Sequence, residues 1–133
     1  KTFQALRIFV NKEITELLYG IANATKVLKP GGKLLVISFH SIEDKIIKYF
    51  FQNYSKNKSK PSRYLPESDF EKIILFENYA NKVIKPSQKE VSINRPSRSA
   101  KLRLAVRSKN KFIFPKKLIQ KFEKYLNIEA VHA

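Results

Sequence analysis

The sequence contains no cysteine and only two histidines, which limits the metal and redox chemistry open to it. Without cysteine, disulfide bonds and zinc–cysteine sites are excluded. His40 and His132 are far apart and form no metal-binding spacing, so we expect no metal. No apolar run approaches the roughly 18 residues of a membrane span, and no signal peptide follows Lys1. We therefore expect a cytoplasmic chain without a membrane partner, and a start at Lys1 rather than Met predicts a fragment or processed product.

Acidic residues are also scarce: there are 11 Asp and Glu against 27 Lys and Arg, a formal net charge of +16. Such a charge predicts an acidic partner, and nucleic acid is the commonest one. The alternative is a lysine-rich surface without a specific role, because 21 of the 27 basic residues are lysine. The arginines are more informative, since four of them fall within residues 95–107 and arginine binds phosphate through two parallel hydrogen bonds.

The amino-terminal half reads as part of an α/β fold. Residues 3–28 predict one amphipathic helix, because apolar side chains recur at steps of three and four: Leu6, Val10, Ile14, Leu17, Ile21, Ala24 and Leu28. Pro30 and the pair Gly31-Gly32 then predict a turn. Residues 33–39 are nearly continuously apolar, which favours a strand buried on both faces, as in a parallel sheet.

A second helix is expected at about 42–54, with Ser41 as its N-cap and with Glu43 and Asp44 as capping or salt-bridge residues. Residues 55–69 are polar and carry two prolines, so they predict a loop. Residues 72–77 resemble a strand, with a possible continuation through Val83 and Ile84.

In the carboxy-terminal half, the capping box at 87–90 predicts a short helix, and 94–99 predict a polar loop. Residues 101–107 alternate, so we expect a strand with Leu102, Leu104 and Val106 on one side. Its other side would be a basic outer face of Lys101, Arg103 and Arg107. After Lys109 the tail predicts one amphipathic helix at about 116–126.

Several motifs together resemble one protein family. They are Thr2-Phe3-Gln4-Ala5-Leu6-Arg7-Ile8, Leu28-Lys29-Pro30-Gly31-Gly32-Lys33-Leu34, Ile37-Ser38-Phe39-His40-Ser41-Ile42-Glu43-Asp44-Lys45, Lys85-Pro86-Ser87 and Arg98-Ser99-Ala100-Lys101-Leu102-Arg103. In this order they resemble the bacterial 16S ribosomal RNA cytosine-N4 methyltransferases, the RsmH (MraW) family. The string around His40 and the string from Arg98 to Arg103 are specific when they occur together. One departure is Asn94-Arg95-Pro96-Ser97, where the family more often reads Asn-Pro-Arg-Ser.

The resemblance implies the carboxy-terminal part of a class I, Rossmann-like methyltransferase sheet, with about three strands and flanking helices. Residues 1–108 would form this portion of the domain, and 109–133 a basic tail. The family's substrate would be 16S ribosomal RNA or the small ribosomal subunit. The resemblance also implies that its cofactor, S-adenosylmethionine, is bound mainly by the amino-terminal part of the family. In this sequence the only glycine pair, Gly31-Gly32, precedes a strand and not a helix, so it lacks a dinucleotide-type cradle. The alternative is a basic RNA- or ribosome-binding module without catalytic activity.

The resemblance also suggests site residues, each with a structural alternative. Ser38, His40 and Ser41 lie at the carboxyl end of the predicted buried strand, where open α/β sheets bind ligands, so they could line a pocket for a flipped cytosine. The alternative is a helix cap and a hydrogen-bonded histidine. Gln4 and Arg7 could face the same substrate, or Arg7 could pair with Asn11 or a carboxylate. The candidate RNA-backbone contacts are Arg95, Arg98, Ser99, Lys101 and Arg103, unless they form only a solvated strand face.

Overall fold

The structure, a computed structural model, describes residues 2–56 and 73–131 and divides the chain into two compact units. One unit joins the two ends of the chain, up to Val27 and from Phe114 onward. The other unit runs from Leu28 to Ile113 and holds the sheet. Among the helices formed by these described residues, none combines the length and the apolar content that crossing a membrane requires.

The predicted amino-terminal helix is broken into two. Helix α1 (Thr2–Val10) ends before Asn11, and α2 (Glu13–Val27) begins after Lys12. The break lies at Lys12, whose φ of 55° is in the left-handed region. The expectation of one continuous helix is therefore wrong at this point. The buried side chains also differ from the predicted apolar stripe. Leu6 and Val10 of α1 are 56% and 63% exposed. The buried residues of α2 are Ile14, Leu18, Ile21, Ala22 and Thr25.

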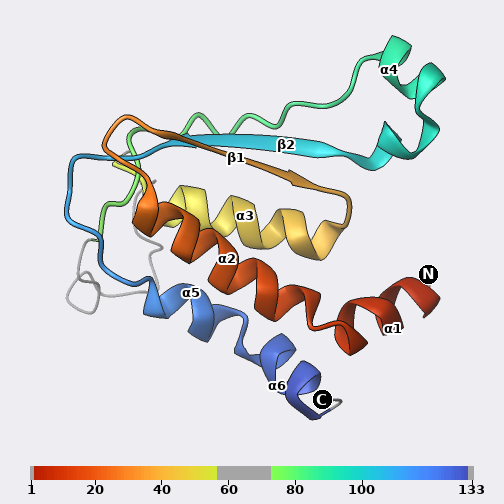
Figure 1. The fold of residues 1–133 in the computed structure, drawn as a ribbon, viewed down its shortest axis with the longest axis horizontal. Coiled ribbons are helices and arrows are strands. Elements are labelled where there is room, and N and C mark those ends of the chain that lie inside the picture. The colour runs from red at the N-terminus through yellow and green to blue at the C-terminus, as the bar shows by residue number, and fades with distance from the viewer. Residues whose placement is uncertain (1, 57–72, 132–133) are drawn as a thin grey trace, which may run out of the picture. The chain divides into compact units, whose positions relative to one another are not determined.

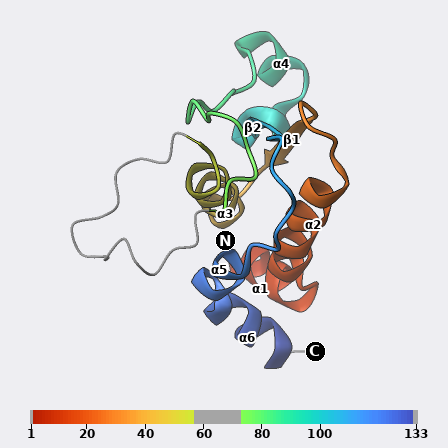
Figure 2. The ribbon, with the colours of Figure 1, turned by 90° about the vertical axis from the view of Figure 1, so that its left-hand side faces the viewer.

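The carboxy-terminal tail packs in the same unit as α1 and α2 (Figure 2). It forms α5 (Lys116–Lys121) and α6 (Glu123–Val131) instead of the single helix predicted for 116–126. Phe122 separates them with a φ of −111° and is buried with Leu118. The burial of these two apolar side chains agrees with the amphipathic character predicted for the tail.

The second unit contains two antiparallel strands, β1 (Lys33–Ser38) and β2 (Lys101–Val106) (Figure 1). Both lie within a residue of the predicted strands. A third segment follows β2 on its other side, through bridges at Phe76 and Ile84. Of the expected strand at 72–77, the described residues 73–77 form only isolated bridges at Phe76. Further along, between Phe76 and Ile84, Asn81 takes a left-handed φ of 53°. The predicted set of three strands thus becomes two strands and one bridged segment among the described residues.

The burial of the two faces of β2 is the reverse of the prediction, and β1 is not buried on both faces. In the register of the sheet, Leu35 lies opposite Leu104, and Val36 lies opposite Arg103. The face of Val36 and Arg103 is the one toward α3 (Ser41–Asn53), because Arg103 bonds to a side chain of that helix. Leu35 is 56% exposed, whereas Arg103 is 6% exposed. The expected burial of β1 on both faces and the expected basic outer face of β2 are therefore both wrong.

Aromatic rings fill the space between α3 and the segment that follows residue 73. Phe50 and Phe51 of α3 each meet the ring of Phe76 edge-on, with centroids 5.2 Å apart. Tyr79 meets Phe51 in the same way at 5.5 Å. Edge-to-face pairs stabilise a core beyond their buried area, by roughly 1 kcal/mol each. This cluster fixes α3, and with it the turn that joins β1 to α3.

Two short helices precede β2. Helix α4 (Gln88–Ile93) begins as the capping box predicts, because the Ser87 hydroxyl accepts a hydrogen bond from the N–H of Glu90 at 3.1 Å. The expected polar loop is a 3-10 helix, η2 (Arg95–Ser99), with Pro96 in its first turn. The predicted loop at 55–69 lies largely outside the described residues, since residues 57–72 are not described.

Candidate functional site

The carboxyl end of β1 brings three of the predicted site residues together in a single turn. Ser38 is the last residue of the strand, His40 is the N-cap of α3, and Ser41 is its first residue. Ser38 is 1% exposed, and within the described part of the chain its hydroxyl has no hydrogen-bond partner. Buried hydroxyls are almost always bonded, so this one calls for an explanation.

The helix cap differs from the predicted one. Ser41 is not the N-cap; His40 holds that position with an extended backbone, and its side chain makes no capping hydrogen bond. Glu43 instead reaches back, and its carboxylate accepts a hydrogen bond from the N–H of Phe39 at 3.2 Å. The predicted capping role of Glu43 is thus confirmed. Ser41 is exposed beside the half-buried His40.

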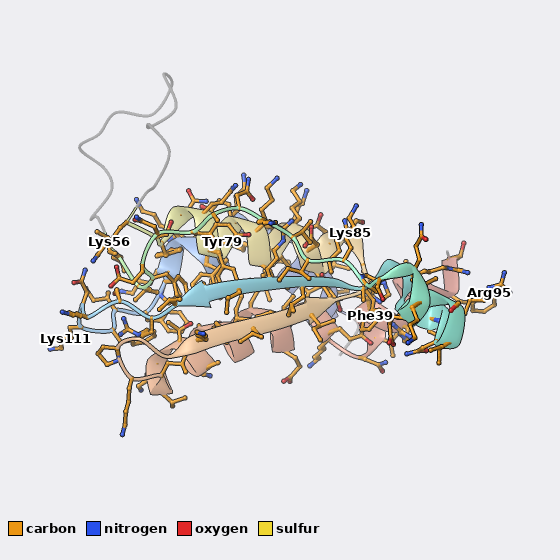
Figure 3. The ribbon with its side chains drawn as sticks, turned by 90° about the horizontal axis from the view of Figure 1, so that it is seen from above. Phe39, Lys56, Tyr79, Lys85, Arg95 and Lys111 are labelled. Carbon is orange, nitrogen blue, oxygen red and sulfur yellow. The ribbon has the colours of Figure 1, made fainter. Side chains whose placement is uncertain are left out.

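Register places the candidate RNA-contacting residues at the same end of the sheet. Ser38 lies opposite Lys101, the first residue of β2, and η2 leads directly into Lys101. Figure 3 shows Phe39 and Arg95 at this end, with Lys111 at the opposite end. Arg95, Arg98 and Ser99 are exposed. The Ser38 hydroxyl, the His40 imidazole and the two arginines of η2 therefore lie at the same end of this unit.

Arg103, a predicted RNA contact, is used inside the protein. Its guanidinium donates to both carboxylate oxygens of Asp44, at 2.7 and 3.0 Å, and to the Tyr79 hydroxyl at 2.8 Å. These hydrogen bonds from Arg103 lower the pKa of Asp44 against the opposing effect of burial, with further help from the charges of Lys101 and Lys48. The same bonds raise the pKa of Arg103. Asp44 thus has the salt-bridge role predicted for it, with a partner that local sequence does not reveal.

The other basic residues of the predicted strand, Lys101 in β2 and Arg107 just after it, are also engaged. Lys101 is 40% exposed at its side chain and lies 3.8 Å from the Asp44 carboxylate. Arg107 is buried and donates to the backbone oxygens of Leu75 and Ser108. Of the basic side chains on this strand, Lys101 is the most accessible to solvent.

Gln4 and Arg7 lie on α1, in the unit formed by the chain ends. The Arg7 side chain is 56% exposed and lies 3.4 Å from the carboxylate of Glu13, which is the structural alternative considered for it. The side chain of Gln4 lies outside the described part of the chain.

Sequence reasoning missed Phe39 as a candidate site residue. Its ring is 51% exposed beside His40, at the end of the sheet that carries Arg95 (Figure 3). An exposed aromatic beside basic residues is a surface on which a nucleobase can stack. Alternation along the strand places Phe39 on the face of Leu35 and Ile37, which are also exposed, although the sequence predicts that this face is buried.

The glycine pair does not form a cofactor cradle. Gly31 takes a φ of 83°, and its N–H donates to the carbonyl of Arg107 at 2.9 Å. A Cβ at Gly32 would lie 2.9 Å from the carbonyl oxygen of Lys29, so the turn itself excludes a side chain. Both glycines therefore serve the turn into β1, and these residues do not fit a role in holding S-adenosylmethionine.

Comparison with known proteins yields one family and a consistent set of relatives. The model of the MraW methylase family matches residues 1–108. A protein of Parvibaculum lavamentivorans called ribosomal RNA small subunit methyltransferase H is 47% identical over 108 residues, which are 81% of this chain and 32% of that protein. Proteins of the same name from Hyphomonas neptunium and Bartonella henselae are 43% and 46% identical, over 80% and 86% of this chain and 31% and 32% of their own length. The chain spans about a third of the length of these relatives.

Proposed function

The chain belongs to the MraW methylase family, and from that premise we propose that it is part of an enzyme that methylates 16S ribosomal RNA. The methyl group would pass from S-adenosylmethionine to the N4 atom of a cytosine. In this proposal residues 1–108 are the carboxy-terminal part of a Rossmann-like domain, and 109–133 are a basic tail. Strand β1, the bridged segment around Phe76 and Ile84, and β2 would then be the fifth, sixth and seventh strands of its sheet. S-adenosylmethionine would be bound mainly by the part of the family that the chain does not cover.

The observation that carries the proposal is the buried Ser38 hydroxyl beside His40, which has no hydrogen-bond partner among the residues that the structure describes. Leaving a buried hydroxyl without a partner costs roughly 1–3 kcal/mol. A ligand that forms a hydrogen bond with this hydroxyl would remove that penalty, which favours binding of the ligand. A cytosine offers both donors and acceptors on its edge, and enzymes that modify bases read that edge in a pocket. Ser38, Ser41 and His40 would orient the exocyclic amine, and Phe39 would stack on the base or its neighbour.

The arginines of η2 would hold the RNA backbone next to that pocket. Arg95 and Arg98 are exposed at the end of the sheet where β1 stops, and Lys101 and Ser99 continue this surface. Arg103 is not part of the surface, because its donors are bonded to Asp44 and Tyr79. Phosphate contacts fix the register of the substrate, while the pocket selects the base.

RNA binding by the chain tests the surface. A fluorescently labelled 16S ribosomal RNA fragment should bind with an affinity that falls steeply with salt. Replacing Arg95 and Arg98 by Gln should reduce affinity about tenfold or more and flatten the salt slope by up to about 2, one for each phosphate that an arginine no longer neutralises. The matched control is Lys109→Gln with Lys111→Gln, which removes the same charge at the other end of the unit (Figure 3). If the two double variants lose the same affinity, RNA binding depends only on the total charge of the chain and not on Arg95 and Arg98 as a site.

Methyl transfer tests the pocket. A chimera in which the chain replaces the matching segment of the Parvibaculum relative should methylate N4 of a 16S cytosine, read out by mass spectrometry of the RNA. In that chimera, His40→Ala should lower turnover while leaving S-adenosylmethionine affinity unchanged. Full turnover in the His40→Ala chimera would show that His40 has no role in the proposed pocket. A chimera that folds and binds RNA but never methylates favours the alternative, a basic RNA-binding module.

A further inference from the structure

The amino end of α2 is capped by a side chain from the far end of the chain. Lys12 holds the N-cap position, since its carbonyl accepts the first helical bond, from the N–H of Glu16 at 3.0 Å. A lysine side chain has no acceptor, so it cannot bind the N–H groups that the start of a helix leaves unpaired. Glu129 binds them instead: its two carboxylate oxygens accept from the N–H groups of Ile14 and Thr15, each at 2.9 Å.

The cap is built as an interior contact. Glu129 is fully buried, and the Thr15 hydroxyl also donates to its carboxylate. A buried carboxylate is tolerated only when hydrogen bonds replace its former hydration. Glu129 lies on α6, which packs against both α1 and α2 (Figures 1 and 2). The docked position of the tail and the capping of α2 therefore depend on one another.

A continuous helix would compete with this arrangement. The sequence pattern of residues 3–28 favours an unbroken helix, in which the N–H groups of Ile14 and Thr15 would bond to the carbonyls four residues earlier. Glu129 would then lose both of its backbone donors and keep only the Thr15 hydroxyl, and a buried carboxylate with too few hydrogen bonds is strongly unfavourable. The broken form instead holds Lys12 at a left-handed φ of 55°, which is unfavourable for a residue with a Cβ.

We propose that the tail acts as a clamp: by capping the amino end of α2, Glu129 keeps α1 and α2 as two separate helices. When the tail is docked, the break at Lys12 is stable; when it leaves, residues 2–27 tend to a single helix. The direction of α1, which carries Arg7, thus depends on the tail. This role goes beyond the proposed function, because the tail lies outside residues 1–108 that match the family.

Glu129→Gln in the full chain tests the clamp, with Glu123→Gln as the matched control. Both residues lie on α6, but Glu123 is exposed. In Glu129→Gln, the Lys12 13Cα chemical shift should move toward helical values, and the amides of α5 and α6 should exchange at least about tenfold faster. Glu123→Gln should change neither. An unchanged Lys12 shift in Glu129→Gln, or equal effects in the two variants, overturns the proposal.

Substitution of Lys12 tests the same coupling without touching the tail. Glycine accepts a positive φ freely and disfavours a continuous helix, whereas alanine keeps the Cβ and removes only the lysine side chain. Lys12→Gly should therefore slow hydrogen exchange in α5 and α6 by about fivefold or more relative to Lys12→Ala. This comparison keeps the proposal testable even if Glu129→Gln does not fold. Equal exchange rates in the two Lys12 variants overturn it.

Discussion

The guanidinium of Arg103 is bonded through two nitrogens to the carboxylate of Asp44, 59 positions away in the sequence. The pair joins β2 to α3, and the Tyr79 hydroxyl accepts a third hydrogen bond from Arg103. Both charged side chains are buried. The interaction therefore fixes β2 to the helix whose amino end carries His40 and Ser41.

Replacing Arg103 by Lys should destabilise the chain by roughly 3 kcal/mol, because one ammonium cannot replace the paired geometry and the Asp44 carboxylate stays buried. Urea unfolding followed by circular dichroism measures the change in stability. Arg98→Lys, on the exposed η2 helix, is the control and should change stability by less than about 0.5 kcal/mol. An Arg103→Lys chain as stable as the wild type would show that the pair contributes little.

The same pair predicts a pH dependence of stability. Hydrogen bonds from Arg103 lower the pKa of Asp44 below its ordinary value near 4. A lowered native pKa contributes stability that is present above the unfolded value and is lost as the pH falls through the native value. The urea midpoints of wild type and Asp44→Asn should therefore differ at pH 6 and converge below about pH 4. Glu90→Gln, on exposed α4, should not reproduce this convergence.

Ser38→Ala should leave stability unchanged or raise it by up to about 1 kcal/mol, because it removes a buried hydroxyl that has no partner among the described residues. Ser108→Ala is the contrasting variant: its hydroxyl donates to the carbonyl of Ile74 at 2.9 Å, so its removal should cost about 1 kcal/mol. Thermal unfolding compares the two. A Ser38→Ala chain less stable than Ser108→Ala would mean that the hydroxyl supports the fold rather than a ligand.

Local signals predicted the elements well. The short helix at 88–93 begins where Ser87 and Glu90 place it, since both partners of the cap lie within four residues. Strand β1 and helix α3 are also close to their predicted bounds, because apolar runs and spacing are read from neighbouring residues. The predicted cluster of Ser38, His40 and Ser41 follows from their positions in one turn.

The features that the sequence did not predict depend on contacts between residues far apart in the chain. The alternation of β2 predicted two faces correctly but assigned the buried one to the leucines, because nothing near Arg103 in the sequence indicates that Asp44 would neutralise it inside. The break at Lys12 was missed for the same reason, as its capping residue Glu129 is more than 110 positions away. The exposed Phe39 was overlooked because the face of β1 that carries it was expected to be buried.

The chain alone should show no heat of binding with S-adenosylmethionine in titration calorimetry. Within the described residues, the only adjacent glycines are committed to the turn before β1: Gly31 donates to the Arg107 carbonyl, and Gly32 leaves no space for a ligand near the Lys29 carbonyl. Titration of the same sample with the 16S ribosomal RNA fragment is the positive control, because it shows that the protein is folded and competent. Micromolar binding of S-adenosylmethionine would contradict the prediction and place a cofactor site within this third of the family, in which case His40→Ala and Ser38→Ala should be the first variants tested for weaker cofactor binding.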